Sequence, residues 1–362
     1  MSNKKIVHYN LDRIEKENAD FNLIYGERSN GKSYQVKHKR GILKYLETGK
    51  RFILMRRWKD EVTTEKIEQY FADVDVSKLT EGKYNCVVMY RKVLYLGIYD
   101  IEKGKSIKGE KIGYVVALSQ EQNYAGASYL DVEDIIFEEF MSRSMYIGKN
   151  EPAKLMNFYS TVDRKRGTTK IWMVGNTISQ VCPYLYEWDL HYLMQNQKQG
   201  TIITKTVQAT EDDTVKIAIE YCASTGVSSH TIGRHSDMMN KGTWQTDPQP
   251  HLPKSKNEYE VVFKFGFQYQ NFRFLCENLY DNETGEMCFF IYPYKGDFKK
   301  NLLVFSDTVK QSRFWHRNIY DFNLPNERLK SRLSNFRESN IFYATDQCGT
   351  NFKQLIDFSI RK

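Results

Sequence analysis

Residues 26–33 read Gly-Glu-Arg-Ser-Asn-Gly-Lys-Ser and are the most informative stretch of the chain. They match the pattern G-x-x-x-x-G-K-[ST] in full, between an apolar run at 21–25 that predicts a strand and a segment at 31–48 that predicts a helix. In this motif the glycines let successive backbone N–H groups point at a phosphate, and the positive end of the helix adds attraction. The stretch therefore predicts a phosphate-binding strand, loop and helix.

The same motif assigns a task to its fixed residues. Lys32 is expected to reach the β- and γ-phosphate oxygens, and Ser33 to ligate Mg²⁺. A glycine-rich turn with an exposed lysine is the alternative, and the strand and helix around the motif argue against it. We therefore expect ATP and Mg²⁺ as cofactors. The residues expected around the nucleotide are Gly26, Glu27, Arg28, Ser29, Asn30, Gly31, Lys32, Ser33 and Tyr34.

A pair of acids, Glu138 and Glu139, follows the apolar run at 134–137. Ligands of α/β proteins bind at the carboxyl ends of such strands. In this interpretation Glu138 supports Mg²⁺ and its waters, while Glu139 polarises the attacking water as a catalytic residue. A glutamate in the first place departs from the usual aspartate, although its longer side chain still reaches a metal-bound water. The alternative is a solvated acidic turn.

Two further features favour nucleotide hydrolysis over a small-molecule kinase, which a strand, loop and helix of this kind would also suit. Asn176 ends a strand predicted at 171–174, where its amide can hydrogen-bond the attacking water or the γ-phosphate. Arg164 and Arg166 lie in a basic cluster at the end of a helix predicted over 151–166. This cluster either caps the helix or supplies an arginine finger to a neighbouring site.

Composition sets the limits within which these motifs act. The chain has 362 residues, 41% of them hydrophobic, which predicts two or three domains with packed cores. Lys and Arg exceed Asp and Glu by 53 to 45, giving a net charge of +8 that suits a polyanion or an ordinary solvated surface. No apolar stretch approaches the length of a membrane helix. The six scattered cysteines predict neither disulfides nor a zinc ribbon, and the polar start lacks the apolar core of a secretory signal.

The order of patterns along the chain divides it into three parts. Through residue 208, strand-like runs alternate with helical segments, which predicts an α/β domain with a mainly parallel central sheet. Residues 209–257 contain three closely spaced prolines and are expected to be a linker, with one small helix over 213–223. Residues 258–362 are expected to form a smaller α+β domain, with strands at 259–274 and 287–294 on either side of a turn at 282–285. Further strands are expected at 51–55, 85–99 as a hairpin, and 112–118.

Four stretches resemble the DNA-encapsidation ATPases of small podophages with protein-linked linear genomes (Salasmaviridae-type). These stretches are 26–34, 51–57, 135–140 and 174–177, so the resemblance is specific in the N-terminal domain. The family is related to terminase large subunits and belongs to the additional-strand, catalytic-glutamate class of P-loop NTPases. The resemblance thus implies that class of fold for residues 1–208.

The same resemblance implies a motor that drives double-stranded DNA into a preformed capsid by ATP hydrolysis. Its subunits would form a ring, a homopentamer, at the portal vertex, in the host cytoplasm and transiently attached to the procapsid. An arginine of one subunit would complete the neighbour's site, with Arg166 the first choice and Arg164 and Arg143 behind it. Expected partners are double-stranded DNA, the portal or connector, the capsid and other subunits, with a structural RNA or a terminal protein as further candidates and no membrane. A helicase-like ATPase that remodels nucleic acid and a nucleotide-gated, portal-binding structural protein remain as alternatives.

DNA contacts should be electrostatic and independent of sequence. Lys103, Lys105 and Lys108 form a basic segment that could reach a central channel, or equally be a solvated hairpin tip. Arg56 and Arg57 could instead act near the nucleotide. In terminase large subunits the C-terminal domain is an RNase H-like nuclease whose metals need acids on its first strand. Because 261–274 contains no Asp or Glu, we expect a nuclease-like fold that lacks the metal ligands.

Overall fold

The computed structural model consists of two units, Met1–Trp244 and Gln245–Lys362. It describes residues 8–100, 102–142, 146–148, 150–209, 213–227, 232, 236–269, 272–306, 314–316, 336 and 340–360. Within these ranges, no helix is both long enough and apolar enough to cross a membrane. All six cysteines are free thiols, as their scattered positions predict.

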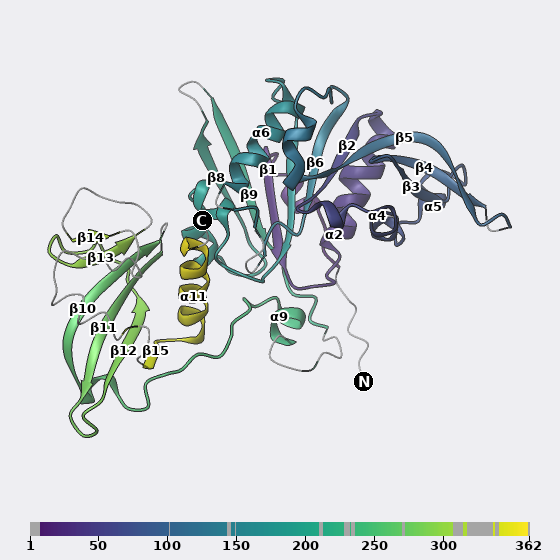
Figure 1. Ribbon diagram of the computed structural model, residues 1–362. Helices are drawn as coiled ribbons and strands as arrows, with labels where there is room; N and C mark the ends of the chain where they lie inside the picture. Colours follow the sequence, from purple (N-terminus) through teal and green to yellow (C-terminus); the bar gives the residue numbers. More distant parts are fainter. Residues whose placement is uncertain are drawn as a thin grey trace. The chain divides into compact units, whose positions relative to one another are not determined.

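The described part of the first unit is built on a nine-stranded sheet in the order β3-β4-β5-β2-β6-β7-β1-β9-β8 (Figure 1). The six central strands β5, β2, β6, β7, β1 and β9 are parallel to one another. At one edge β4 pairs antiparallel with both β5 and β3, and at the other edge β8 pairs antiparallel with β9. Their bounds are β1 Phe21–Gly26, β2 Arg51–Arg56, β3 Cys86–Tyr90, β4 Val93–Asp100, β5 Lys105–Ala117, β6 Val132–Glu138, β7 Lys170–Asn176, β8 Ile202–Gln208 and β9 Thr214–Tyr221. The mainly parallel sheet that alternating patterns predict is therefore confirmed.

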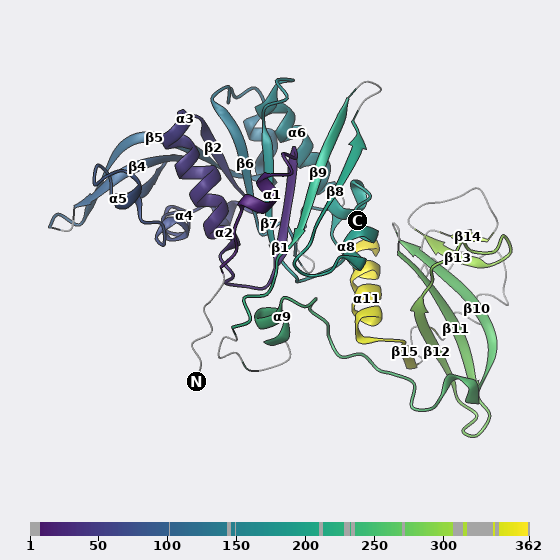
Figure 2. The same ribbon diagram turned by 180° about the vertical axis from the view of Figure 1, so that it is seen from behind.

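Helices cover both faces of this sheet (Figures 1 and 2). One face carries a continuous helical stretch made of α2 Lys32–Val36, a π-helical segment Lys37–Leu43 and α3 Lys44–Thr48, and the other carries α6 Glu151–Asp163. Ile24, Leu54 and Ile136 belong to the apolar core under the first of these helices. The remaining helical segments are α1 Asp12–Glu15, η2 Lys59–Glu61, α4 Thr64–Phe71, α5 Val76–Leu79, η3 Leu118–Tyr124, α7 Pro183–Glu187, α8 His191–Asn196 and α9 Ser236–Lys241.

The helix expected over 213–223 is wrong, because this segment forms strand β9 instead. It pairs in parallel with β1 and antiparallel with β8, so its backbone hydrogen bonds are satisfied inside the sheet. Val215, Ile217 and Ile219 are β-branched and favour a strand where a neighbouring strand is available to pair. The first unit therefore runs past residue 208, through β9 and α9 to Trp244.

The second unit contains a mixed sheet in the order β14-β13-β10-β11-β12-β15. Its elements are η4 Lys256–Glu258, β10 Tyr259–Tyr269, β11 Phe272–Asp281, β12 Met287–Pro293, β13 Leu303–Ser306, β14 Trp315–His316, β15 Asn340–Tyr343 and α11 Asp346–Ile360. The single strand expected at 259–274 is thus two antiparallel strands, β10 and β11, whereas the expected turn at 282–285 does connect β11 to β12.

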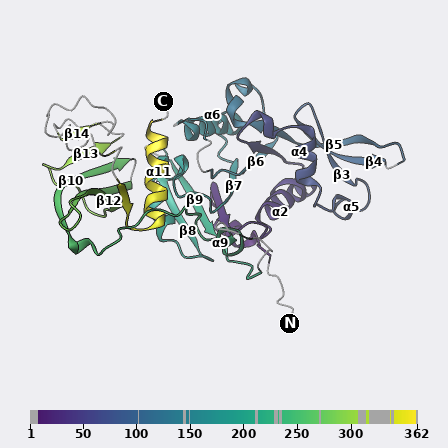
Figure 3. The same cartoon turned by 60° about the horizontal axis from the view of Figure 1, so that its bottom comes forward.

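Helix α11 lies beside this second sheet (Figure 3), and aromatic rings pack it against the strands. The ring of Phe352 on α11 lies 4.8 Å from that of Phe267 and 5.4 Å from that of Phe274, both edge-to-face. Such pairs add to the free energy of burial. The smaller α+β unit predicted from the strand pattern is therefore a sheet with its own aromatic core.

Candidate functional site

The loop between β1 and α2 carries the phosphate-binding motif at the carboxyl edge of the sheet. Gly31 has φ +95°, a left-handed conformation that favours glycine and that sets the start of α2. A Cβ on Gly26 would lie 3.0 Å from the Cβ of Cys222 on the segment after β9, closer than ordinary contact. The backbone conformation therefore favours glycine at 31, and a larger residue at 26 would require Cys222 to shift.

Lys32 is the buried cation of this loop, with 4% of its surface exposed. Its Nζ donates to the backbone oxygen of Glu27 at 2.5 Å and to Oδ1 of Asn176 at 2.7 Å. Burial lowers the pKa of Lys32, while the nearby acids oppose this shift. Asn176 ends β7 directly beside Gly26 in the sheet register. The predicted lysine and asparagine thus meet at the same point.

Ser33 and Glu138 lie in direct contact, from α2 and the end of β6. The Ser33 hydroxyl donates to Glu138 Oε2 at 3.0 Å, and the hydroxyl of Tyr70 on α4 donates to Oε1 at 2.7 Å. Burial raises the pKa of Glu138 even though these hydrogen bonds lower it. Tyr70 is a member of this cluster that we did not predict, because no motif marks α4 in the sequence.

Glu139, the second acid, faces solvent rather than the Ser33 hydroxyl. Its backbone is left-handed, with φ +57°, and 57% of its side chain is exposed. Arg56 Nη2 lies 3.0 Å from Glu139 Oε2 and 3.2 Å from Glu61 Oε1. The ending of β2 beside β6 explains why Arg56 and Glu139 meet. Arg56 therefore does lie at the acidic pair.

Arg57 is hydrogen-bonded to the backbone of the turn that follows the acids. Its guanidinium donates to the backbone oxygens of Glu139 at 2.9 Å and Phe140 at 2.7 Å, and pairs with the buried Glu151 at 2.9 Å. The Tyr184 hydroxyl donates to the other side of this pair, to Glu151 Oε1 at 2.7 Å. This satisfied ion pair fixes the backbone that carries Glu139.

The other loop residues point in different directions. The side chains of Arg28 and Ser29 are exposed, that of Glu27 is buried, and Tyr34 stacks on His38 with ring centroids 5.5 Å apart. Asn30 closes the loop internally, since its Oδ1 accepts from the backbone N–H of Lys32 at 3.1 Å. Only part of the nine-residue set therefore has side chains gathered at Lys32.

The arginines expected to act between subunits lie at the opposite edge of the sheet. Arg166 donates to the backbone oxygens of Leu130 at 2.7 Å and Val132 at 3.0 Å, at the amino end of β6. Arg164 is exposed and donates to the backbone oxygen of Ala127 at 2.8 Å. Arg143 lies outside the described residues.

The basic segment predicted to contact DNA comprises Lys103, in the connection between β4 and β5, and the first residues of β5. Lys103, Lys105 and Lys108 are exposed, and Lys103 pairs with Asp100 at 3.1 Å. Lys108 Nζ lies over the ring of Tyr90, 3.7 Å from its centroid. In the sheet, strands β2, β6 and β7 lie between β5, which carries two of these lysines, and β1, which leads into the phosphate-binding loop.

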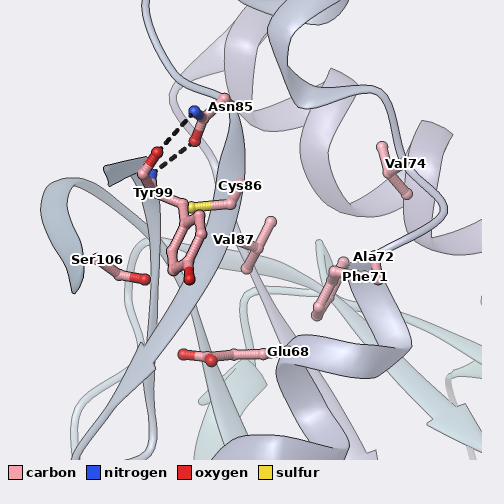
Figure 4. A pocket seen from close by; sticks show the side chains of 9 residues that line it. All are labelled: Glu68, Phe71, Ala72, Val74, Asn85, Cys86, Val87, Tyr99 and Ser106. Atoms are coloured by element: carbon pink, nitrogen blue, oxygen red, sulfur yellow. Dashed lines mark hydrogen bonds between the residues drawn. The ribbon is translucent and has the colours of Figure 1, made fainter. Parts of the chain in front are cut away.

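A separate hollow of about 410 Å³ lies between α4 and the strands β3 to β5 (Figure 4). Figure 4 shows the side chain of Asn85 bonded to the backbone of Tyr99, with a donated bond of 3.2 Å and an accepted bond of 2.7 Å. Glu68 and Phe71 line the hollow from α4. None of the loop or acidic residues lines it, so it is not part of the site described above.

The site contains a buried cation, Lys32, and a hydroxyl that is hydrogen-bonded to a carboxylate, Ser33 with Glu138. A second carboxylate, that of Glu139, lies at the same carboxyl edge of the sheet. Within the described residues, no group of three or more His, Cys, Asp or Glu is placed to hold a metal ion by itself. The fold and this site define a P-loop nucleoside triphosphatase.

The chain belongs to the podovirus DNA encapsidation protein (Gp16) family, whose model matches residues 3–202. It is a DNA-packaging ATPase that works in a packaging motor, and it binds nucleotide. The family expected from four short stretches is thereby confirmed. The match also covers both acids, Lys32 and Asn176 in one continuous span.

Individual relatives agree with the family. The chain is 30% identical over 281 residues to the DNA packaging protein of Bacillus phage B103, covering 67% of this chain and 81% of that one. It is 26% identical over 275 residues to the DNA packaging protein of Bacillus phage PZA, covering 74% of each chain. Its fold is similar to a solved chain of the bacteriophage Phi-29 viral genome packaging motor assembly, with TM-score 0.56, 20% identity and coverage of 97% and 99%.

Proposed function

We propose that this ATPase works as a ring of subunits at the portal vertex of a preformed capsid and drives double-stranded DNA inward. The observation that carries the chemical part is the meeting of Lys32, Ser33 and Glu138 at one edge of the sheet, with Glu139 next to them. A homopentamer is the assembly that the family resemblance favours. The portal or connector, the capsid, and a structural RNA or terminal protein are the partners we propose.

The residues at this edge fit ATP with Mg²⁺. Ser33 Oγ and the Glu138 carboxylate are hard oxygen donors 3.0 Å apart, the kind that Mg²⁺ prefers alongside phosphate oxygens. When bound, the ion would neutralise charge that develops on the phosphates. Lys32 is buried and held at this point of the loop. When a nucleotide binds, Lys32 would exchange its present oxygen partners for phosphate oxygens. Glu139 would orient the attacking water and accept its proton, with Asn176 hydrogen-bonding the water or the γ-phosphate.

The finer fold class also belongs to this proposal. Strand β7 lies between β1, which precedes the phosphate-binding loop, and β6, which carries the acids, and this supports the additional-strand, catalytic-glutamate class. In the second unit the succession β12-β11-β10-β13-β14 supports an RNase H-like sheet. Its buried acid Glu277 pairs with Lys256 at 2.5 Å and Lys264 at 2.7 Å, which favours a structural role over nuclease chemistry.

Action of an arginine in trans is supported by where the arginines lie. Strand β6 has seven residues, about 20 Å in length, and it separates Arg166 at its amino end from the acids at its carboxyl end. Arg166 therefore cannot reach its own nucleotide without unfolding the sheet. The hydrogen bonds that Arg166 makes to the described residues go to backbone and hydroxyl oxygens. Its positive charge is therefore available to the nucleotide site of a neighbouring subunit. Arg164, the more exposed of the two, is the second choice.

A mixed-subunit assay tests this arrangement. Subunits carrying Arg166→Ala are combined with subunits carrying Lys32→Ala, each inactive alone. Recovery of ATPase activity in the mixture is the expected result, because an intact Lys32 site can receive Arg166 from the other subunit. No recovery, with both variants folded and assembled, would count against trans action by Arg166, and the same mixture with Arg164→Ala then tests the second choice.

DNA contact by the segment around Lys103, Lys105 and Lys108 is supported by its charge. Residues 83–111 hold seven Lys or Arg and three Asp or Glu, so this one stretch carries half of the chain's net charge of +8. A packaging motor must grip every base pair, which suits phosphate contacts without base readout. Replacing the three lysines with Gln should weaken DNA-stimulated ATPase and flatten its salt dependence, while DNA-free hydrolysis stays unchanged.

A further inference from the structure

The carboxylate of Glu27, the first variable residue of the phosphate-binding loop, is hydrogen-bonded to residues outside the loop. Glu27 is 1% exposed, and its Oε2 accepts from the Ser224 hydroxyl at 2.7 Å while its Oε1 accepts from the Thr225 backbone N–H at 2.7 Å. A buried carboxylate is costly unless both oxygens are satisfied. Its partners lie on the segment that follows β9, so Glu27 joins the loop to that segment.

After α9 the chain contacts the phosphate-binding loop again, at Gly242. Gly242 packs against the loop so closely that a Cβ there would lie 2.8 Å from the Glu27 backbone nitrogen, and its φ of +68° also favours glycine. The Tyr221 hydroxyl donates to the Gly242 backbone oxygen at 2.6 Å, and Gln199 Nε2 donates to that of Lys241 at 2.8 Å. Glu27 is thus held on two sides.

Aromatic stacking extends this contact to the end of the first unit. The ring of Trp244 stacks on that of Tyr25, 5.4 Å away, and Tyr25 stacks on Tyr221 at 4.6 Å. Tyr25 directly precedes Gly26, the first residue of the motif. Trp244 is the last residue of the first unit, and the chain continues from it into the second unit.

Glu27 therefore has one hydrogen bond toward the nucleotide site and two toward this segment. Its backbone oxygen holds Lys32 Nζ at 2.5 Å, a bond that must weaken when Lys32 turns to phosphate oxygens. Its carboxylate holds residues 224 and 225 at the same time. A displacement of the residue 27 backbone would therefore disturb the hydrogen bonds between its carboxylate and residues 224 and 225.

We propose that Glu27 is a positioning residue that couples nucleotide occupancy of the loop to the conformational freedom of residues 222–227 and 241–244, the parts of the segment that contact the loop and lead into the second unit. The inference rests on the proposed ATP site, since it requires Lys32 to bind phosphate. By linkage, a change in this segment must alter nucleotide affinity to the same extent that nucleotide alters the segment.

Hydrogen exchange of the full chain, measured with and without Mg-ATPγS, tests this coupling. In the native protein, nucleotide should change exchange in 222–227 and 241–244 as well as slow it in 32–48. In Glu27→Ala the effect on 32–48 should persist, whereas the effect on the segment should fall by at least about tenfold, because two hydrogen bonds to a charged acceptor are lost. Glu27→Gln should restore it, because an amide can accept from the residue 225 N–H and donate to the Ser224 hydroxyl.

A matched pair of variants separates coupling from general destabilisation. Ser224→Ala removes a hydroxyl that contacts Glu27, while Thr225→Ala removes a neighbouring hydroxyl and keeps the backbone N–H. Ser224→Ala should reduce the nucleotide effect on the segment and Thr225→Ala should not. These variants also serve if Glu27→Ala does not fold.

The outcomes distinguish the coupling from the site itself. An unchanged segment in the native protein, with 32–48 still protected by nucleotide, would overturn the coupling and leave the ATP site intact. A full nucleotide effect on the segment in both Glu27→Ala and Ser224→Ala would overturn it as well. Absence of protection in 32–48 would overturn the ATP site and the coupling together.

Discussion

Arg56 holds Glu139 by an ion pair of 3.0 Å between Nη2 and Oε2, at the open end of the sheet. The pair joins β2 to the turn after β6, and Arg56 also contacts Glu61 at 3.2 Å. The ion pair orients the Glu139 carboxylate toward Arg56 rather than toward Ser33. The contact therefore restrains the residue that we propose as the activator of water.

We expect Arg56→Gln to raise ATP hydrolysis in the absence of DNA several-fold, because Glu139 loses this restraint. Stimulation by DNA should shrink in proportion. Steady-state phosphate release with and without DNA measures both quantities. Lys66→Gln, which changes a neighbouring cation on α4, is the matched control. A fall in both rates with Arg56→Gln would instead mean that Arg56 assists the chemical step.

Tyr70→Phe should weaken the apparent affinity for Mg-ATP by about tenfold, the scale of one hydrogen bond to a charged acceptor. Without the Tyr70 hydroxyl, Glu138 Oε1 loses its 2.7 Å donor and the carboxylate is less well positioned. Titration of the ATPase rate with Mg²⁺ at fixed ATP gives the affinity. Tyr84→Phe removes a hydroxyl that bonds Glu110 at the surface and should leave the titration unchanged. Equal titrations for the native protein and Tyr70→Phe would contradict the prediction.

Glu220 predicts a pH dependence of stability. Burial raises its pKa above the ordinary value, against the hydrogen bond from Tyr9 and the charge of Arg13. The folded state then binds a proton more readily than the unfolded state, so the free energy of unfolding falls as pH rises from the ordinary glutamate pKa through the raised one. Glu220→Gln should remove that part of the dependence. Thermal unfolding between pH 4 and pH 8, which is about the span of such shifts, measures it. Parallel curves for both proteins would be the contrary result.

Arg57→Ala should destabilise the first unit by about 3–5 kcal/mol, because it leaves the fully buried Glu151 without its cation. Urea unfolding followed by circular dichroism measures the loss. Lys103→Ala, which removes one partner of an exposed pair, should leave the unfolding midpoint unchanged. Equal midpoints for both variants would show that the Arg57 pair adds nothing to stability.

Local sequence patterns were sufficient where one short stretch contains the whole signal. Residue type and spacing were enough to predict the loop at 26–33, the strand before the acids and the amide of Asn176. In the structure Lys32 contacts Asn176, and Ser33 contacts Glu138. Glu139 departs from this cluster, since its side chain faces Arg56.

Features that depend on pairing between distant segments escaped prediction. Strand β9 was predicted to be a helix, because its parallel pairing with β1, far away in the sequence, leaves no mark on the local pattern. Tyr70 and the Ser224–Thr225 contact to Glu27 are more than 60 residues from their partners, and no motif connects them. Such contacts are set by tertiary packing rather than by local propensity.

The backbone at Glu139 is left-handed, with φ +57°. At this position the residue that would be most stable differs from the residue that the proposed chemistry needs. A non-glycine residue there costs about 1–2 kcal/mol, and the Arg57 hydrogen bond to the Glu139 backbone oxygen helps to keep it in place. Glu139→Gly would relieve that cost while deleting the carboxylate. A search for thermostable forms of this motor would therefore tend to recover variants at position 139 that are well folded and unable to work.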